Sequence, residues 1–258
     1  MRIFFLSLGL LLAACTDPSS PRLETAADSL AFRVTESSGG LAAWNELPGI
    51  AFEWAVVRDS SEVVRTRHVW DKQGDRVRSE WPGGGDSVFV AVFQPSRFDE
   101  DAPEGEVALN GVALVGPEVA ERLVEANGRF VNDGYWLLAP LKVLDPGVRR
   151  AVEARDGADR LALSFDGVGL TPGDRYWIEV DEVSGAMTGW SFLLESGNEG
   201  RFQWVEPVTL DTPGGQITLS RMKVSDDGGV ILTEPTPLLD IDETEFTDLT
   251  PRLGQSAL

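Results

Sequence analysis

The chain has 258 residues, with 42 Asp plus Glu against 22 Lys plus Arg, and its formal net charge is -20. Such a surplus of carboxylates argues against nucleic acid as a partner and against docking onto anionic lipid headgroups, because both would repel the protein. The length suits one large or two small domains, and a single cysteine leaves no disulfide to hold them together.

The first fifteen residues, MRIFFLSLGLLLAAC, are typical of a targeting segment. Arg2 supplies a positive start, and the apolar run over residues 3–12 is too short to span a bilayer. The run ends in LAAC, which resembles the lipobox of bacterial lipoproteins. This resemblance implies that residues 1–15 are a lipoprotein signal peptide and that Cys15 receives a diacylglyceryl group. The alternative is an ordinary secretory signal followed by a free thiol.

Residues 16–22, TDPSSPR, are polar and rich in Pro and Ser, as expected of a tether between a lipid anchor and a folded domain. Buried acyl methylenes contribute about 0.8 kcal/mol each, so several chains on Cys15 would hold the protein firmly on a membrane. Thr16 rather than Asp follows the cysteine. By resemblance to enterobacterial sorting rules, this favours the outer membrane, facing the periplasm, over the inner one.

Most of the remaining chain alternates apolar and polar residues with a period of two. Before that, residues 23–47 have near-helical spacing broken by Gly39-Gly40, which predicts two short helices. Gly, Pro and Asp turns then separate short strands, as in an antiparallel meander. The eleven predicted strands are residues 50–57, 61–70, 75–81, 87–93, 149–155, 160–165, 175–181, 187–195, 202–210, 217–224 and 230–234.

One helix interrupts the strands. Residues 117–127, PEVAERLVEAN, have Pro at the start and an apolar face, which predicts an amphipathic helix ending at Asn127-Gly128. The apolar segment FVNDGYWLLAP, residues 130–140, follows directly, and we expect it to form part of the lining or lid of a cavity.

The predicted fold class is mainly β with a few helices (α+β). We expect a single open, strongly curved antiparallel half-barrel of about eleven strands over residues 23–239, with helices as a lid. The acidic tail, residues 240–258, is expected to be loosely attached.

Catalytic and metal-binding patterns are weak. The one histidine, His68, cannot by itself supply the ligands of a zinc site, and no serine lies in a G-x-S-x-G elbow. Acidic pairs such as Asp226 and Asp227 lie in polar turns, and no glycine-rich phosphate motif precedes a helix. We therefore expect no enzyme, no metal and no cofactor. A hydrolytic alternative would require His68 to meet Asp71 and a serine in space.

The placement of the aromatic residues is the most informative feature of the sequence for a binding site. Seven of the eight tryptophans fall in predicted strands or in residues 130–140. Large rings often fill sheet cores, which is one interpretation. However, a single sheet with few helices has too little on its concave face to bury so many rings, so some should line a cavity. The predicted lining residues are Trp54, Trp70, Trp81, Tyr135, Trp136 and Leu138.

Four segments resemble an uncharacterised family of bacterial lipoproteins with the fold of the periplasmic lipoprotein carrier and receptor proteins (LolA/LolB-like). They are GGLAAWNEL (39–47), HVWD (68–71), FVNDGYWLLAPLKVLDPGV (130–148) and VGLTPGDRYWIEVDEVSG (168–185). The resemblance implies an open β-barrel with helices as a lid, and in the carriers a hydrophobic cavity that accepts acyl chains. No loop of this chain is recognisable as the counterpart of the receptor's leucine-bearing insertion loop, so what the resemblance implies is the broader function, binding of a lipid or other apolar ligand.

Two functions are consistent with these patterns. The leading hypothesis is a membrane-anchored periplasmic lipoprotein that binds an acyl chain, lipid or other apolar ligand in a concave cavity, as part of envelope lipid or lipoprotein handling. The alternative is a structural or protein-interaction lipoprotein whose core is filled by its own side chains and whose acidic surface meets a basic partner. The sequence specifies neither the ligand nor a protein partner.

Overall fold

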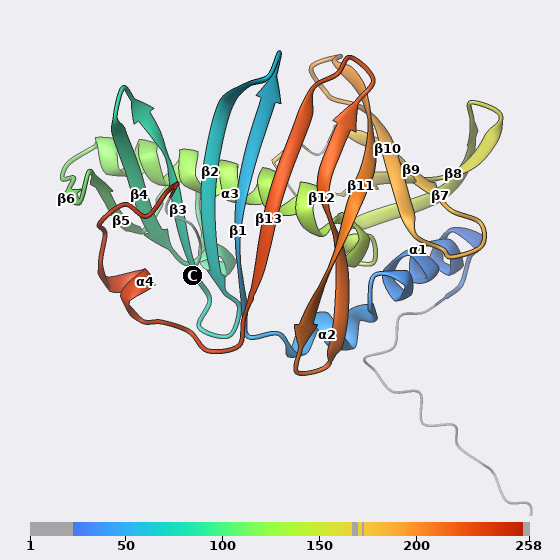
Figure 1. Cartoon of the computed structure of the whole chain (residues 1–258), viewed down its shortest axis with the longest axis horizontal. Coiled ribbons are helices and arrows are strands. Elements are labelled where there is room, and N and C mark those ends of the chain that lie inside the picture. The colour runs from blue at the N-terminus through green and yellow to red at the C-terminus, as the bar shows by residue number, and fades with distance from the viewer. Residues whose placement is uncertain (1–22, 167–169, 172, 255–258) are drawn as a thin grey trace, which may run out of the picture.

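A computed structural model of the chain describes residues 23–166, 170–171 and 173–254. The described residues contain thirteen strands in one antiparallel sheet, which is open and curved (Figure 1). The strands are β1 (Gly49–Arg58), β2 (Ser61–Asp71), β3 (Arg76–Gly84), β4 (Ser87–Phe93), β5 (Gly105–Leu109), β6 (Val112–Ala113), β7 (Val148–Arg155), β8 (Ala158–Phe165), β9 (Arg175–Val180), β10 (Met187–Leu193), β11 (Glu199–Thr212), β12 (Gly215–Ser225) and β13 (Val230–Leu238). The predicted open antiparallel half-barrel is confirmed.

The described residues also form four α-helices and one short 3-10 helix. They are α1 (Ala26–Ser37), α2 (Gly40–Glu46), η1 (Pro95–Arg97), α3 (Glu118–Lys142) and α4 (Thr244–Thr247). The two short helices predicted before the first strand are confirmed. In the part of the chain that the structure describes, no helix combines the length and the apolar character needed to cross a bilayer.

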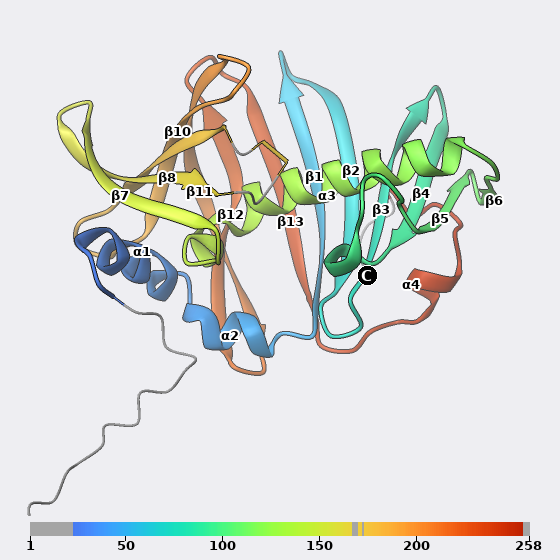
Figure 2. The same cartoon turned by 180° about the vertical axis from the view of Figure 1, so that it is seen from behind.

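The chain builds the sheet as two meanders that meet at its centre. Strands β1 to β6 follow one another outward to one edge, and β7 to β13 run from the other edge back to the middle. There β13 pairs with β1, with Gly49 opposite Leu238. The connection between the meanders is α3, which leaves one edge of the sheet and reaches the other across its concave face (Figure 2).

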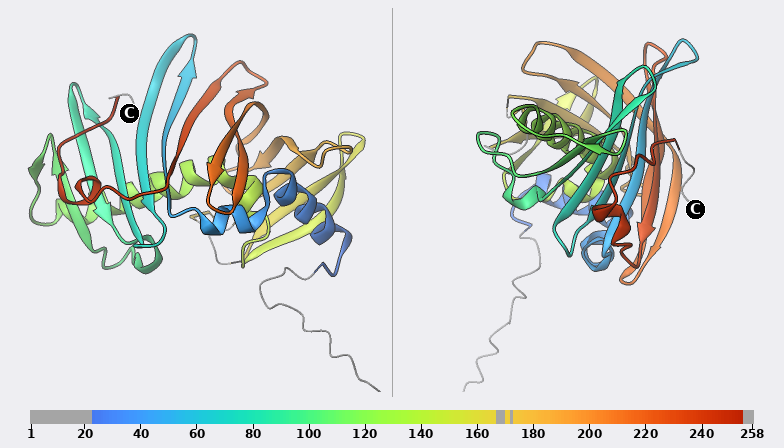
Figure 3. Two further views of the ribbon diagram at one scale, coloured as in Figure 1. Left: turned by 60° about the horizontal axis from the view of Figure 1, so that its bottom comes forward. Right: turned by 90° about the vertical axis from the view of Figure 1, so that its left-hand side faces the viewer.

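This connection is shorter than the sheet that it crosses. Helix α3 has 25 residues, so it is roughly 37 Å long at 1.5 Å per residue. Thirteen strands at the usual spacing of about 4.8 Å extend roughly 58 Å. A straight connection can therefore join the two edges only if the sheet curves around it, and Figure 3 shows α3 lying inside that curve.

The prediction of a helix ending at Asn127-Gly128 was wrong, because α3 continues through that dipeptide to Lys142. The helical period of buried residues runs across the supposed break, and this tertiary packing outweighs the low helix propensity of glycine. Gly134 lies against the sheet, where an added Cβ would meet the Phe52 ring at 3.9 Å. The buried residues on this face include Leu123, Ala126, Phe130, Asp133, Gly134, Leu137, Leu138 and Leu141.

Two strands exceed the eleven predicted ones. Strands β5 and β6 form a hairpin at the edge of the sheet, where the segment after residue 100 had no predicted strand. Asn110 and Gly111 both have positive φ, at 51° and 79°. This is the backbone of the two-residue turn that Asn-Gly favours between antiparallel strands.

The C-terminal segment is more firmly attached than we expected. Helix α4 and the residues after it, up to Gly254, lie on the outer face of the sheet over β3 (Figure 1). Arg78 donates hydrogen bonds to the carbonyl oxygens of Glu245, Asp248 and Thr250, and Glu245 also pairs with Arg67. The acidic tail is held because its carboxylates and carbonyls meet arginines of β2 and β3. Residues 1–22 and 255–258, including Cys15 and the predicted tether, lie outside the described residues.

Candidate functional site

An apolar cavity of about 630 Å³ lies between the C-terminal half of α3 and strands β7 to β10. Its volume falls in the range of small-molecule and cofactor sites. Most of its wall is hydrocarbon and aromatic ring, with polar groups at a few places. The wall consists of Trp70, Phe130, Val131, Asn132, Gly134, Tyr135, Trp136, Leu138, Lys142, Asp145, Pro146, Val148, Phe165, Leu170, Thr171, Asp174, Tyr176, Phe192 and Leu194.

Four of the six predicted lining residues lie on this wall: Trp70, Tyr135, Trp136 and Leu138. The other two lie outside it. Trp81 is 1 % exposed and stacks on Phe89, with 5.4 Å between the ring centroids. Trp54 packs against the cluster that contains Ile50 and Phe52. The structure thus separates the predicted aromatics into cavity wall and packed core.

Besides Phe130 of α3, three aromatic residues of the wall that come from strands, Phe165, Tyr176 and Phe192, were not among the six predicted lining residues. They come from β8, β9 and β10, and Tyr176 is the cross-strand partner of Phe192. Their positions alternate within strands that the period of two did predict. These residues could have been predicted by asking which positions of adjacent strands share a face of the sheet, whereas counting tryptophans misses them.

Tyr135 is the centre of the aromatic wall. Its ring contacts Phe165 edge to face with 5.7 Å between centroids, Tyr176 at 5.9 Å and Trp190 at 5.9 Å. Such offset and edge-on contacts stabilise aromatic clusters beyond their buried area. Because α3 carries Tyr135 and the strands carry the other rings, the cluster ties the helix to the sheet along one side of the cavity.

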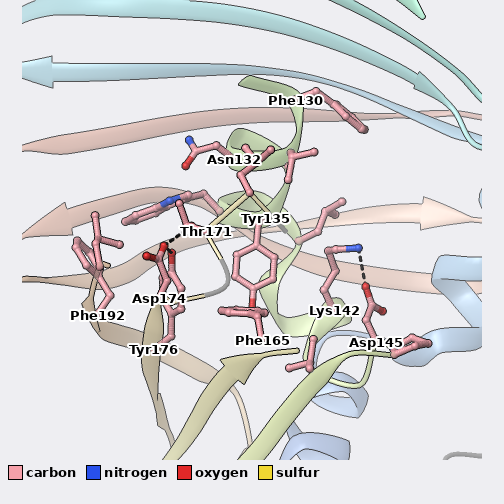
Figure 4. Close-up of a pocket in the computed structure, with 18 of the residues that line it drawn as sticks. Phe130, Asn132, Tyr135, Lys142, Asp145, Phe165, Thr171, Asp174, Tyr176 and Phe192 are labelled. Atoms are coloured by element: carbon pink, nitrogen blue, oxygen red, sulfur yellow. Dashed lines mark hydrogen bonds and ion pairs between the residues drawn. The ribbon is translucent and has the colours of Figure 1, made fainter. Parts of the chain in front are cut away.

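Two polar pairs flank the cavity (Figure 4). The Asp174 carboxylate accepts hydrogen bonds from the Thr171 hydroxyl at 2.6 Å, the Tyr176 hydroxyl at 3.4 Å and the backbone N–H of Glu195 at 2.9 Å. Lys142 Nζ lies 2.7 Å from an Asp145 carboxylate oxygen. Burial raises the pKa of both Tyr135 and Tyr176, so the two hydroxyls stay protonated at any physiological pH.

A buried chain of polar side chains connects α3 to the sheet beside the cavity. Asp133 on α3 accepts from Thr66 at 2.6 Å and lies 2.9 Å from His68 Nε2, and His68 Nδ1 lies 2.9 Å from the Ser79 hydroxyl. His68 and Ser79 are fully buried, and Asp133 is 2 % exposed. A buried network in which every member is paired fixes the position of its elements. Here it fastens α3 onto β2 and β3.

The hydrogen-bonded network of Asp133, His68 and Ser79 bears on the hydrolytic alternative. His68 does meet a serine and an aspartate, but the aspartate is Asp133; Asp71 instead pairs with Arg76 at 2.7 Å. A nucleophile must reach a reacting atom of the substrate. Neither Ser79 nor His68 lies on the cavity wall, and both are enclosed by the sheet and α3. The geometry therefore favours a structural role for His68.

No protein-family model matches the chain, and no match was found among curated proteins. Solved structures do resemble it. A DUF1329 family protein from Desulfovibrio piger has 10 % identity and a TM-score of 0.43, over 84 % of this chain and 94 % of that one. A LolA superfamily protein from Nitrosomonas europaea has 12 % identity and a TM-score of 0.42, over 84 % and 97 %.

A third structure, described as an outer membrane lipoprotein-sorting protein domain from Vibrio parahaemolyticus, has 10 % identity and a TM-score of 0.40, over 84 % of this chain and 94 % of that one. These three matches are all under 25 % identical with TM-scores under 0.5, so they carry no argument about what this chain does. The function has to be argued from the cavity itself.

Proposed function

We propose that this chain is a non-enzymatic lipoprotein of the cell envelope that holds an acyl chain, lipid or similar apolar ligand in the cavity under α3. The observation that carries the proposal is the apolar cavity of about 630 Å³. Removing apolar surface from water contributes about 25 cal/mol per Å². A hydrocarbon chain placed against Phe165, Phe192 and Leu194 would gain this contribution, which offsets the cost of ordering the chain.

Anchoring at Cys15 is the second part of the proposal. The lipobox at residues 12–15 and the polar segment after it support acylation of this cysteine. Thr16 supports the outer membrane, with the domain facing the periplasm. The anchor would keep the cavity within reach of the lipids that supply its ligand.

Ligand binding is tested on unacylated protein, made with Cys15 replaced by Ser. Native mass spectrometry should find a co-purified lipid, and palmitic acid or a phospholipid should change tryptophan fluorescence. Trp136→Phe removes one of the two indole fluorophores of the cavity wall, the other being Trp70, so it should clearly reduce this fluorescence change. Trp81→Phe is the matched control, because Trp81 is buried away from the cavity. A protein that is empty and unresponsive to every added lipid contradicts the proposal.

The anchor is tested separately, in cells. Full-length protein should incorporate labelled palmitate and fractionate with the outer membrane. Cys15→Ser should abolish the labelling and release the protein from membranes. Labelling that persists in this variant would contradict acylation of Cys15 without bearing on the cavity.

A further inference from the structure

The sheet has two edge strands of very different length. Strand β6 at one edge has two residues, whereas β7 at the other has eight. Figure 2 shows β7 and β8 as a hairpin at the margin of the molecule. An edge strand offers unpaired backbone N–H and C=O groups to another chain, and proteins often protect such an edge by keeping it short or by placing a proline in it. Strand β7 has neither protection.

The hydrogen bonds of β7 show which of its backbone groups are free. The N–H of Asp166 donates to the carbonyl of Gly147, so these two residues form a hydrogen-bonded pair beside the first pair of the β7–β8 ladder. Such pairs alternate along antiparallel strands, so the odd-numbered residues of β7 direct their backbone groups to β8. Arg150, Val152 and Ala154 direct theirs outward, where no described residue pairs with them.

The side chains along this edge leave room for a second strand. Ala151 is small and exposed, and Val152 is 39 % exposed. The Arg150 side chain bends back to Asp28 and to the carbonyl of Val148, so it occupies the edge only near the start of the strand. The open part of the edge is therefore centred on residues 151 and 152.

The charges of β7 restrict how a second copy of the same strand can pair there. Outward-facing residues must lie opposite outward-facing residues, and three two-fold registers form at least two such pairs. Placing Val152 opposite the partner's Val152 sets Arg149 against the partner's Arg155. Placing it opposite the partner's Ala154 brings the two Glu153 carboxylates together. Like charges directly opposite each other are destabilising, so both registers are disfavoured.

The third register places Val152 opposite the partner's Arg150. It sets Arg149 against the partner's Glu153 on both sides of the two-fold axis, with the small Ala151 side chains on the axis itself. Opposite charges that face each other across two strands stabilise the pair. We propose that two copies of this protein associate through β7 in this register, so that their sheets continue as one. This association does not depend on a ligand in the cavity.

The formal net charge of -20 opposes the association of two copies. At 0.15 M salt, however, charges are screened beyond about 8 Å, so the charges at the edge itself matter more than distant ones. Strand β7 carries three arginines and one glutamate, unlike the acidic chain as a whole. One strand pair buries less than a standard interface of about 1,600 Å², so we expect a weak dimer with a dissociation constant on the order of 100 μM.

Analytical ultracentrifugation of the unacylated Cys15→Ser protein measures the association, from about 0.01 to 1 mM, a range around the expected dissociation constant. Wild-type protein should change from monomer to dimer over this range. Arg149→Glu and Glu153→Arg should each weaken self-association by at least about 10-fold, because each sets like charges against each other. An equimolar mixture of the two variants should form a heterodimer, because each copy then offers the charges that the other lacks.

Two further variants serve as control and as backbone test. Arg97→Glu makes the same change of charge at an exposed arginine that follows β4, far from β7 in the sheet, so self-association should stay unchanged. Val152→Pro removes an N–H that points outward, so it should abolish the dimer while β7 stays paired with β8. If Val152→Pro fails to fold, the mixture of the two charge variants still decides.

Three results would overturn the proposed dimer. One is wild-type protein that stays monomeric over the whole range. Another is a mixture of Arg149→Glu and Glu153→Arg that stays monomeric. The third is tighter self-association of Arg149→Glu alone, which would favour the register that sets Arg149 against the partner's Arg155.

Discussion

The two halves of the concave face solve the same packing problem differently. Under the N-terminal half of α3, strands β3 to β5 and the helix fill the space with their own side chains, and we call this the filled half. Its core consists of Val77, Trp81, Phe89, Ala91, Phe93, Val107, Leu123, Ala126 and Phe130. Under the C-terminal half of α3, beside β7 to β10, the rings form a wall and leave the cavity, and we call this the open half.

The difference teaches that curvature alone does not make a binding site. In the filled half, Leu123 and Phe130 of the helix point into the sheet, and Phe130 meets Phe93 edge to face at 6.3 Å. In the open half, Tyr135, Phe165 and Tyr176 contact one another along one side instead. The filled half thus has only a packed core, whereas the open half combines a packed core, which includes Ile178 and Trp190, with a cavity.

The largest effect should come from emptying the filled half. Trp81→Ala removes a fully buried ring that stacks on Phe89, and we expect a loss of about 3–5 kcal/mol in the free energy of unfolding. Urea unfolding measures this loss. The affinity of the folded variant for palmitic acid should stay unchanged, since Trp81 is off the cavity wall. A parallel loss of affinity would show that the halves do not pack independently.

A buried lysine in the middle of the sheet shows whether water reaches the region between the two halves. Lys223 on β12 is fully buried, and its ammonium donates to the Ser220 carbonyl and the Thr233 hydroxyl, with no carboxylate partner among the described residues. Burial lowers the pKa of Lys223 from its ordinary 10.5 to about 7. The unfolded chain therefore binds more protons between these two pH values, so this lysine destabilises the fold most below pH 7 and ceases to do so above about pH 10.5.

Lys223→Met should accordingly unfold with a free energy a few kcal/mol higher than wild type at about pH 6. The difference between the two proteins should shrink as the pH rises from about 7 towards 10. Urea unfolding at several pH values measures this difference directly. A difference that does not vary with pH would mean that Lys223 stays charged and hydrated in the folded protein.

The cavity of the open half should tolerate filling. Leu194 lies on the cavity wall, so Leu194→Trp should place a ring in the cavity and weaken binding of palmitic acid by about 10-fold or more, with a change in unfolding free energy under about 1 kcal/mol. Leu193→Trp is the matched control, because the adjacent strand position faces the other side of the sheet. Equal losses of affinity in both variants would place the ligand elsewhere.

The smallest expected effect concerns the helix that both halves share. Gly134 is in the interior of α3, and an added Cβ would make ordinary contact with Phe52 at 3.9 Å. Gly134→Ala should therefore raise the free energy of unfolding by about 0.5–1 kcal/mol, through helix propensity. Thermal unfolding measures this gain. Destabilisation would instead show that the sheet and helix need glycine for closer approach at this point.

Much of the fold was predictable because a period of two and a turn residue are local signals. The same locality explains the errors. Asn127 and Gly128 are weak helix formers, and the packing of Phe130 and Leu137 onto a distant sheet overrides them. The sequence of the tail alone predicts a loose acidic segment, because its partners, Arg67 and Arg78, are far away in the chain.

The candidate site was predictable only in part, for a related reason. Alternation indicates which residues of a strand share a face, but it does not tell how far a helix stands from that face. Trp81 and Trp70 therefore have the same sequence signature, although one is packed in the core and the other lines the cavity. Tyr135 and Leu138 were found through the apolar run around them, whereas Phe165 and Tyr176 stand in ordinary strand sequences.

The pairing of β1 with β13, which we call the seam, should form later in folding than the hairpins within each meander. Each meander is made of neighbouring hairpins, which can form from local contacts, but the seam joins residues from opposite ends of the domain, such as Gly49 and Leu238. Closing so long a loop is entropically costly and slow. The curved sheet is therefore completed only after β13, its last strand in chain order, has been synthesised and has paired with β1.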